Sequence, residues 1–284
     1  VTKKKIKRCK EDVVFDAACF IILTLVLFVV AYPLYWVIIS SISAPSAVSS
    51  GKVLLHPIGF TLKGYAEVFK NDQVMRGFLN SLIITFCGVM VYLIVTLPTS
   101  YALSRSNFSG KKPITIFYLI TMFFGGGLIP TYLVIQRLQM LNTIWALILP
   151  GCLSVYNMIV ARTFFKSNIS EELYEAAEID GCTQARFFFQ IALPLSKAII
   201  AILVLYYGVG HWNSYFSALV YISDKAKYPL QLVLRNILIT NQPALSQTAT
   251  TAAARAALQE KQQLIDVMKY SLIIISSIPV LVMY

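Results

Sequence analysis

The sequence predicts an all-α, polytopic membrane protein that crosses the bilayer with six transmembrane helices. Of its 284 residues, 57% are hydrophobic and only 13% are charged, whereas soluble domains carry about 25% charged residues. Six uncharged stretches recur along the chain, and a transmembrane helix needs about 20 mostly apolar residues. None of them alternates apolar and polar residues as the strands of a membrane barrel do. The composition excludes a disordered chain, a small disulfide scaffold and an ordinary soluble enzyme.

The first uncharged stretch, residues 17–39, follows a tail of residues 1–16 that is rich in lysine and arginine. The stretch is longer than the apolar centre of a signal peptide, which has about 7–15 residues. We therefore predict an uncleaved first transmembrane helix within residues 17–42. Residues 43–76 follow as a long loop, and residues 77–104 predict the second span.

The third and fourth stretches are separated by a single arginine. The third covers residues 113–136, and we expect its helix to end at the glycine- and proline-containing tract 125–130, because these residues interrupt helices. The fourth covers residues 138–161. Its helix is expected to begin near Asn142 or Thr143, since both residue types can act as N-caps.

The fifth stretch covers residues 198–223, and the sixth covers residues 270–284. Because fifteen residues rise only about 22 Å, less than the roughly 30 Å hydrocarbon core, we expect the sixth span to be cut short by the chain end. The core of residues 77–284 then contains a long loop, 224–269, before the last span. Its segment 252–261 has a helix-favouring composition, and the loop is either a docking surface for another protein or a loosely folded connector.

A dense basic cluster precedes the first span and sets the predicted orientation. Such a segment beside an apolar run faces the cytoplasm and anionic lipid, so the predicted partner is membrane lipid and no nucleic acid. The N-terminus is therefore placed in the cytoplasm, and loops 43–76 and 224–269 are placed outside the cell. The cluster consists of Lys3, Lys4, Lys5, Lys7, Arg8 and Lys10.

Several kinds of chemistry are missing from the sequence. No charged residue lies near the middle of a predicted span, where proton relays and voltage sensors need one. The phosphate-binding pattern GxxxxGK[ST] is absent, so energy for active transport would have to come from a partner. The five cysteines form no CxxC pair and the two histidines lie far apart, so we propose no metal site and no catalytic residue.

One predicted cytoplasmic loop, residues 166–194, differs from the rest of the chain. Ser170 is a suitable N-cap, and the two glutamates that follow it suit the positive end of a helix dipole. Gly181 fits the left-handed position after a helix end. Thr183 can cap a second short helix that runs toward Pro194. The loop therefore predicts a helix–turn–helix that lies across the membrane face.

The spacing within this loop resembles the EAA motif of bacterial ABC importer membrane subunits, whose pattern is EAA-x3-G-x9-I-x-L-P. Three further segments look like those of the carbohydrate permeases related to the maltose system, particularly the lipo-oligosaccharide and complex-polysaccharide subgroup. These segments are residues 122–132, 210–215 and 229–232. The residues that match the motif are Glu175, Ala176, Ala177, Gly181, Ile191, Leu193 and Pro194.

This resemblance implies the fold and role of a type I ABC importer permease in the bacterial plasma membrane. Family members pair with a second homologous permease subunit and with two ATPase subunits, which bind ATP and Mg. An extracellular solute-binding protein delivers the oligosaccharide substrate. The permease subunit itself is non-catalytic and holds no cofactor.

The resemblance also implies that the EAA helix docks in a cleft of the ATPase, and the residue types agree with that role. Ala176 and Ala177 carry small side chains that let a partner's backbone approach closely. Glu175 can pair with a basic group, and Gly181 permits the sharp turn. The alternative is an amphipathic helix on the lipid surface, but its acidic face suits anionic lipid poorly.

Polar and aromatic residues within the spans are candidates for the substrate path, because sugars bind through hydrogen bonds and aromatic stacking. Hydrogen bonds between helices would explain any single polar residue equally well, and aromatic residues also gather at membrane interfaces. The candidates are Asn80, Asn157, His211, Trp212, Asn213 and Tyr215.

Two other functions compete with import of an oligosaccharide. An integral membrane enzyme acting on lipid or glycan would need carboxylates or a metal near the interface, whereas the acidic residues cluster in the loop 166–194. An importer of the same fold could instead carry a non-sugar solute such as an amino acid or an ion.

Overall fold

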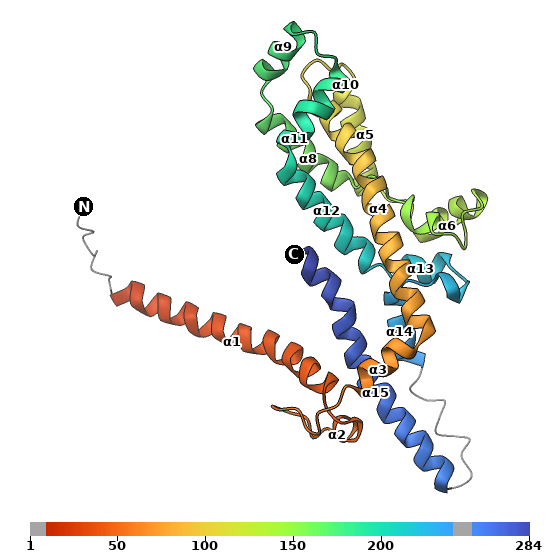
Figure 1. The fold of residues 1–284 in the computed structure, drawn as a ribbon. Coiled ribbons are helices and arrows are strands. Elements are labelled where there is room, and N and C mark those ends of the chain that lie inside the picture. The colour runs from red at the N-terminus through yellow and green to blue at the C-terminus, as the bar shows by residue number, and fades with distance from the viewer. Residues whose placement is uncertain (1–9, 241–251) are drawn as a thin grey trace. The chain divides into compact units, whose positions relative to one another are not determined.

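The computed structural model describes residues 10–240 and 252–284, and these residues form helices and no strands (Figure 1). The predicted all-α class is therefore confirmed. The chain divides into two compact units. Unit 1 consists of Val1–Lys70 and Thr240–Ile275, and unit 2 consists of Asn71–Ile239 and Ser276–Tyr284.

Unit 1 contains helices α1 (Lys10–Ser41), α2 (Pro45–Ser49) and α3 (Lys63–Lys70) and most of α15 (Ala252–Met283). Its small core packs the end of α1 against α2 and α15, and the Trp36 ring meets the Tyr270 ring edge-on at 5.0 Å. Residues 17–35 of α1 carry no charge, and none of them is buried. A helix of this kind requires lipid or another membrane subunit around it.

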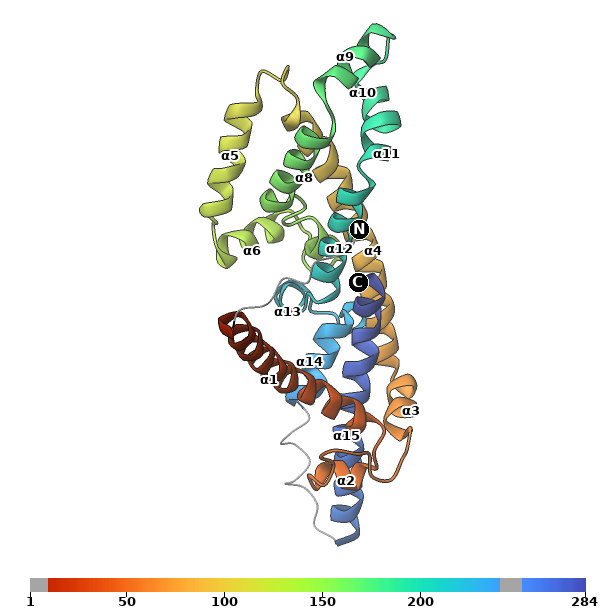
Figure 2. The same cartoon turned by 90° about the vertical axis from the view of Figure 1, so that its left-hand side faces the viewer.

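Unit 2 is organised around α4 (Asp72–Ser104), against which α8 (Val155–Asn168) and α12 (Lys197–Trp212) pack (Figure 2). The N-terminus of α4 is capped by Asn71, whose Oδ1 accepts hydrogen bonds from the backbone N–H groups of Gln73 and Val74 at 3.0 and 3.2 Å. Capping satisfies donors that have no partner within the helix.

The third predicted span is bent at its glycine tract, as expected. Helix α5 (Lys111–Phe123) ends before the tract, and α6 (Leu128–Arg137) follows at an angle of 114°. Gly127 has a φ of +83°, a conformation that glycine adopts at little cost. The prediction that the helix stops here is confirmed.

The prediction that the fourth span is a single helix is wrong. Residues 138–161 contain the short α7 (Trp145–Ile148) and only the first half of α8. Helix α8 begins after Ser154, whose Oγ accepts from the N–H of Asn157 at 3.4 Å. Asn142 is not an N-cap: it has a φ of +60°, and its Oδ1 accepts from the N–H of Asp224 at 3.1 Å.

The last two predicted spans also differ from the structure. Helix α12 ends at Trp212, and the separate helix α13 (Phe216–Tyr221) follows it. The predicted loop 224–269 contains the 3-10 turn η2 (Lys225–Lys227), α14 (Leu230–Thr240) and the start of α15, so its segment 252–261 is helical as its composition predicts.

The predicted start of the sixth span at residue 270 is wrong. The apolar part of α15 covers Gln262–Met283, which is 22 residues. The helix therefore begins before residue 270. The additional residues include Asp266 and Lys269, whose charged groups pair at 3.0 Å. A count of uncharged residues alone could not include this pair.

Three helices of the described ranges are long and apolar enough to cross a membrane, which confirms the polytopic membrane character. They are Glu11–Ser41, Asp72–Ser104 and Gln262–Met283. Counting each of two bent pairs as one further span brings the number to five. These pairs are Lys111–Phe123 with Leu128–Arg137 and Gln184–Leu195 with Lys197–Trp212. The sixth crossing stays a prediction, because α8 has only 14 residues and a straight crossing needs about 20.

The close approach of α4 and α12 predicts a specific sensitivity at Gly88. A Cβ atom there would lie 2.5 Å from Nε2 of the buried His211 ring, so Gly88→Ala forces the two helices apart. We expect a loss of about 1–3 kcal/mol, typical of overpacking, measured as a lower thermal unfolding temperature of the purified chain. The matched control is Gly210→Ala on α12, where nothing lies within 4 Å. Equal unfolding temperatures for both variants would contradict the close packing.

Candidate functional site

The EAA loop (residues 166–194) begins with helix α9 (Glu171–Ile179), which forms as the sequence predicts. Ser170 caps it, with its Oγ accepting from the N–H of Leu173 at 3.3 Å. Glu171 and Glu172 lie in the first turn, where a negative charge meets the positive end of the helix dipole.

Two backbone hydrogen bonds close the end of α9. The N–H of Gly181 donates to the carbonyl of Glu178 at 3.0 Å, and the N–H of Cys182 donates to the carbonyl of Ala177 at 2.9 Å. This pair is a Schellman motif, which requires a left-handed residue, and Gly181 has a φ of +74°. A Cβ at Gly181 would meet nothing within 4 Å, so the glycine is required by backbone conformation and not by space.

The second half of the EAA loop begins with α10 (Gln184–Phe187), whose cap is Thr183. The Thr183 hydroxyl accepts from the N–H of Arg186 at 3.3 Å. A π-helical turn, Phe188–Ala192, and the short α11 (Leu193–Leu195) follow. Proline has no N–H and crowds the carbonyl four residues earlier, and the widened turn before Pro194 accommodates both effects.

A sharp bend connects this segment to the membrane helix. The segment Gln184–Leu195 meets α12 at an angle of 80°. The predicted helix–turn–helix is therefore confirmed, with a π turn that the sequence reasoning did not include.

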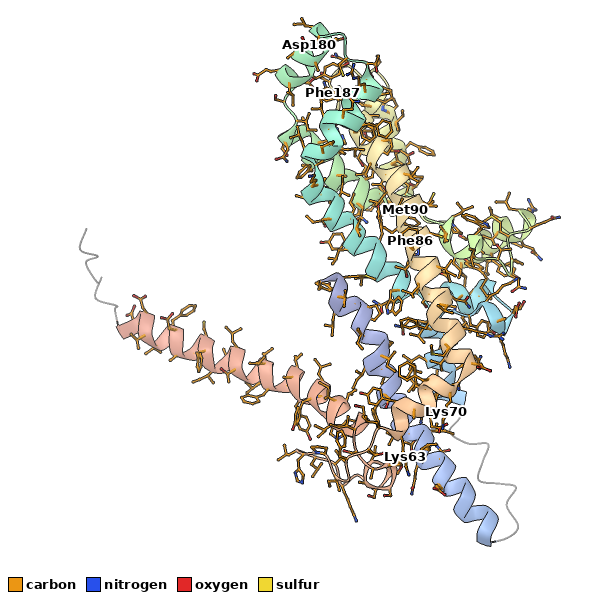
Figure 3. All side chains as sticks on the ribbon, viewed as in Figure 1. Lys63, Lys70, Phe86, Met90, Asp180 and Phe187 are labelled. Carbon is orange, nitrogen blue, oxygen red and sulfur yellow. The ribbon has the colours of Figure 1, made fainter. Side chains whose placement is uncertain are left out.

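An aromatic cluster holds the two arms of the EAA loop together. The Tyr174 ring of α9 meets the Phe187 ring of α10 edge-on at 5.3 Å, and the Tyr101 ring of α4 stacks with Phe187 at 6.4 Å. Phe187 is completely buried, and Figure 3 labels it near Asp180, the residue at the end of α9. The EAA loop is thus attached to the end of the longest helix of unit 2.

Arg105, which ends α4, makes the most direct contact with α9. Its guanidinium donates to a Glu171 carboxylate oxygen at 2.9 Å and lies over the Tyr174 ring with its central carbon 3.9 Å from the ring centroid. The other Glu171 oxygen accepts from the N–H of Ser106 at 3.3 Å. Only 13% of the Arg105 side chain is exposed, whereas 46% of the Glu171 side chain is, so water screens this ion pair from the Glu171 side.

The residues around Arg105 enclose a cavity of about 290 Å³. It lies between the end of α4 and the two arms of the EAA loop, and its lining includes Asn107, Phe108 and Gln184. Tyr174 and Phe188 also line it.

The residues of the EAA motif fall on two different faces. Glu175, Ala176, Gly181 and Pro194 are exposed, and Ile191 and Leu193 are half-buried against the aromatic cluster. Ala177 is only 9% exposed. The expectation that Ala177 faces a partner is wrong, because it lies one turn after Tyr174 on the inner face of α9.

The outer face of α9 carries apolar residues that no part of unit 2 covers. Ile179 is 87% exposed, and Leu173 is 38% exposed. With Glu175 and Ala176 they form a surface that suits another protein better than water.

The structure separates the predicted substrate-path residues into two groups. The first group has structural contacts: the amide of Asn80 donates to the carbonyls of Ala226 and Tyr228 at 2.8 and 3.0 Å. The indole of Trp212 donates to the carbonyl of Ser276 at 2.9 Å and is fully buried. His211 lies against Gly88 and meets the Tyr92 ring edge-on at 4.7 Å. Asn157, on α8, is also buried.

Asn213 and Tyr215 form the second group, and both are exposed between α12 and α13. The Asn213 Oδ1 accepts from the Gln231 amide at 3.4 Å. Contact of any of the six residues with substrate stays a prediction.

Sequence reasoning missed Arg105, Tyr174 and Ile179 as members of this site. The available signal for Arg105 was its position as the first charged residue after the second span. Its pairing with Glu171, 66 positions later, could not be read from the sequence pattern.

Comparison with known proteins gives the family. No family model matches the chain. The chain is 34% identical over 270 residues to the polygalacturonan/rhamnogalacturonan transport system permease protein YtcP of Bacillus subtilis, covering 95% of this chain and 92% of that protein. It is 36% identical over 275 residues to protein LplC of the same bacterium, covering 97% and 90%. The chain belongs to the family of sugar ABC transporter permeases.

A solved structure agrees with this assignment. One chain of a bacterial ABC transporter involved in the import of the acidic polysaccharide alginate superposes with a TM-score of 0.87 at 26% identity, covering 98% of this permease and 96% of that chain. A further relative is the galactooligosaccharides transport system permease protein GanQ of Bacillus subtilis, which is 29% identical over 249 residues. The resemblance found from the EAA motif is thereby confirmed, and so is the permease fold.

The contacts of Arg105 predict that it fixes α9 to α4. We expect Arg105→Ala to increase hydrogen exchange of the α9 backbone amides several-fold, because a partly buried ion pair and a cation–π contact are lost together. Mass spectrometry of the purified permease measures this exchange. The control is Arg186→Ala, whose guanidinium bonds only the nearby Gln190 at 2.9 Å among the described contacts. Unchanged α9 exchange in Arg105→Ala would show that the contact is not what holds the helix.

Proposed function

We propose that this permease translocates an oligosaccharide across the bacterial plasma membrane, as a non-catalytic subunit of an ATP-driven importer. The names of its relatives state transport of polygalacturonan or rhamnogalacturonan, of galactooligosaccharides and of the acidic polysaccharide alginate in related systems, which supports a sugar substrate. The relatives whose names state a role are transport permeases, which favours import over a membrane enzyme acting on lipid or glycan.

The proposed coupling role rests on one observation, which is how the EAA loop is held against α4. Its two arms are fixed to α4 by Arg105 and the aromatic cluster, while Ile179 and Ala176 remain exposed on the outer face. A segment that is attached firmly on one side and apolar on the other can transmit the movement of a docked protein to the membrane helices. The partner is an ATPase subunit, which binds ATP and Mg.

The full complex that we propose contains a second homologous permease subunit, two ATPase subunits and an extracellular solute-binding protein. The N-terminus and the EAA loop then face the cytoplasm. The basic cluster before α1 supports this orientation through the preference of such clusters for the cytoplasmic side; nearly all of it lies outside the described residues.

Along the substrate path, we propose different roles for the two groups of residues. Asn213 and Tyr215 can contact the sugar, because both are exposed at the break between α12 and α13. Asn80 and Trp212 hold neighbouring segments in place through the hydrogen bonds to Ala226, Tyr228 and Ser276.

The test of this proposal uses two substitutions at Gly181. A β-branched residue at a φ of +74° costs about 1–2 kcal/mol or more, so Gly181→Val should reorient the turn and reduce sugar uptake at least several-fold. Gly181→Asn should keep most uptake, because asparagine tolerates the left-handed region. Uptake of rhamnogalacturonan oligosaccharides and galactooligosaccharides is measured in cells that express the complete transporter.

Co-purification of the ATPase subunits provides the second measurement. We expect Gly181→Val to insert normally in the membrane, since no span is altered, but to retain less ATPase or to lose the stimulation of ATP hydrolysis by sugar. Normal uptake and normal ATPase assembly in this variant would remove the coupling role of the EAA loop.

A further inference from the structure

Three successive backbone carbonyls after α2 accept hydrogen bonds from aromatic side chains of α1. The indole N–H of Trp36 donates to the carbonyl of Val53 at 2.8 Å. The hydroxyl of Tyr32 donates to Leu54 at 3.4 Å, and the hydroxyl of Tyr35 donates to Leu55 at 2.6 Å. All of these residues belong to unit 1.

The order of these hydrogen bonds along α1 shows the path of the backbone through residues 53–55. Tyr32 lies one turn farther from the end of α1 than Trp36, and it binds the middle carbonyl of the three. The backbone therefore runs back along α1 to Leu54, where it bends, and then returns. Lys52 and His56 flank this excursion, and both are exposed.

The bend presents two large apolar side chains outward. Leu54 is 60% exposed and Leu55 is 69% exposed, whereas Val53 is only 1% exposed and belongs to the core of unit 1. The segment is thus anchored by Val53 and by the three aromatic donors, with its leucines uncovered by this chain.

The position along α1 places the leucines at the edge of the bilayer. The last acidic residue of α1 is Asp16, and the helix carries no charge after it. A hydrocarbon core spanned by about 20 residues from that point ends at Trp36. Tyr32, Tyr35 and Trp36 then lie at the membrane boundary, where tyrosine and tryptophan concentrate.

A non-helical segment can lie at this depth only if its backbone carbonyls have hydrogen-bond partners in the protein. Inside a bilayer no water is present to bond exposed backbone groups, so an irregular segment must find its partners in the protein. The three aromatic donors provide hydrogen-bond partners for the carbonyls of all three residues. The basic Lys52 beside them suits the phosphate level of the lipids.

We propose that residues 53–55 form a membrane finger that inserts Leu54 and Leu55 among the lipid acyl chains at the Ser41 end of α1. Its partner is the bilayer itself. The finger adds a membrane anchor at the end of α1 and fixes the depth of this helix in the membrane. This role is independent of the coupling function of the EAA loop.

The experiment places a nitroxide spin label at Leu54→Cys. The complete transporter is used in lipid nanodiscs, with the native cysteines Cys9, Cys19, Cys87, Cys152 and Cys182 replaced. Collisions of the label with oxygen, which concentrates in lipid, are compared with collisions with a water-soluble nickel chelate. Val26→Cys in the middle of α1 is the lipid control, and Lys70→Cys at the exposed end of α3 is the water control.

We expect the label at Leu54 to collide more often with oxygen than with the nickel chelate, as the label at Val26 does. Preferential collision with nickel, as at Lys70, would overturn the proposal, since the leucines would then lie in water. Protection from both reagents would also overturn it and would indicate a covering protein, either the second permease or a solute-binding protein.

In a second variant, Tyr35→Phe removes one donor and should increase collisions of the Leu54 label with the nickel chelate relative to oxygen. An unchanged ratio would show that the aromatic donors do not hold the finger.

Discussion

The coupling end of this permease depends on the position of one guanidinium group. Arg105 leaves the end of α4 and lies between the Glu171 carboxylate and the face of the Tyr174 ring. Both partners are on α9, a helix of nine residues, and isolated helices of this length are marginal in water. Tertiary contacts must therefore stabilise it, and Arg105 provides a charged and an aromatic contact at once.

Helix caps and backbone hydrogen bonds within the EAA loop add to the stabilisation that Arg105 provides. Caps at Ser170 and Thr183 start the two arms, and Gly181 closes the first arm with paired hydrogen bonds. Each satisfies polar groups that a short helix would otherwise leave without partners. The finger in unit 1 follows the same rule in a different solvent: Tyr35 and Trp36 donate to carbonyls that would have no hydrogen-bond partner in lipid.

Features determined by nearby residues could be predicted from the sequence, and features determined by distant contacts could not. Both caps, the positive φ of Gly181 and the helix end before the glycine tract follow from residue types within a few positions. The burial of Ala177 depends on the aromatic cluster that it contacts. The span of α15 begins earlier than expected because Asp266 and Lys269 neutralise each other, and hydropathy alone treats both as breaks.

These contacts require that α9 and α4 move as one body, and a distance measurement tests this most directly. Spin labels at Glu172→Cys on α9 and Ile94→Cys on α4, both exposed positions, report the separation of the two helices in the complete transporter. The account predicts one narrow distance distribution that is the same without nucleotide and in an ATP-bound state. A distribution that shifts or broadens between these states would show that α9 moves independently of α4, and would contradict the account.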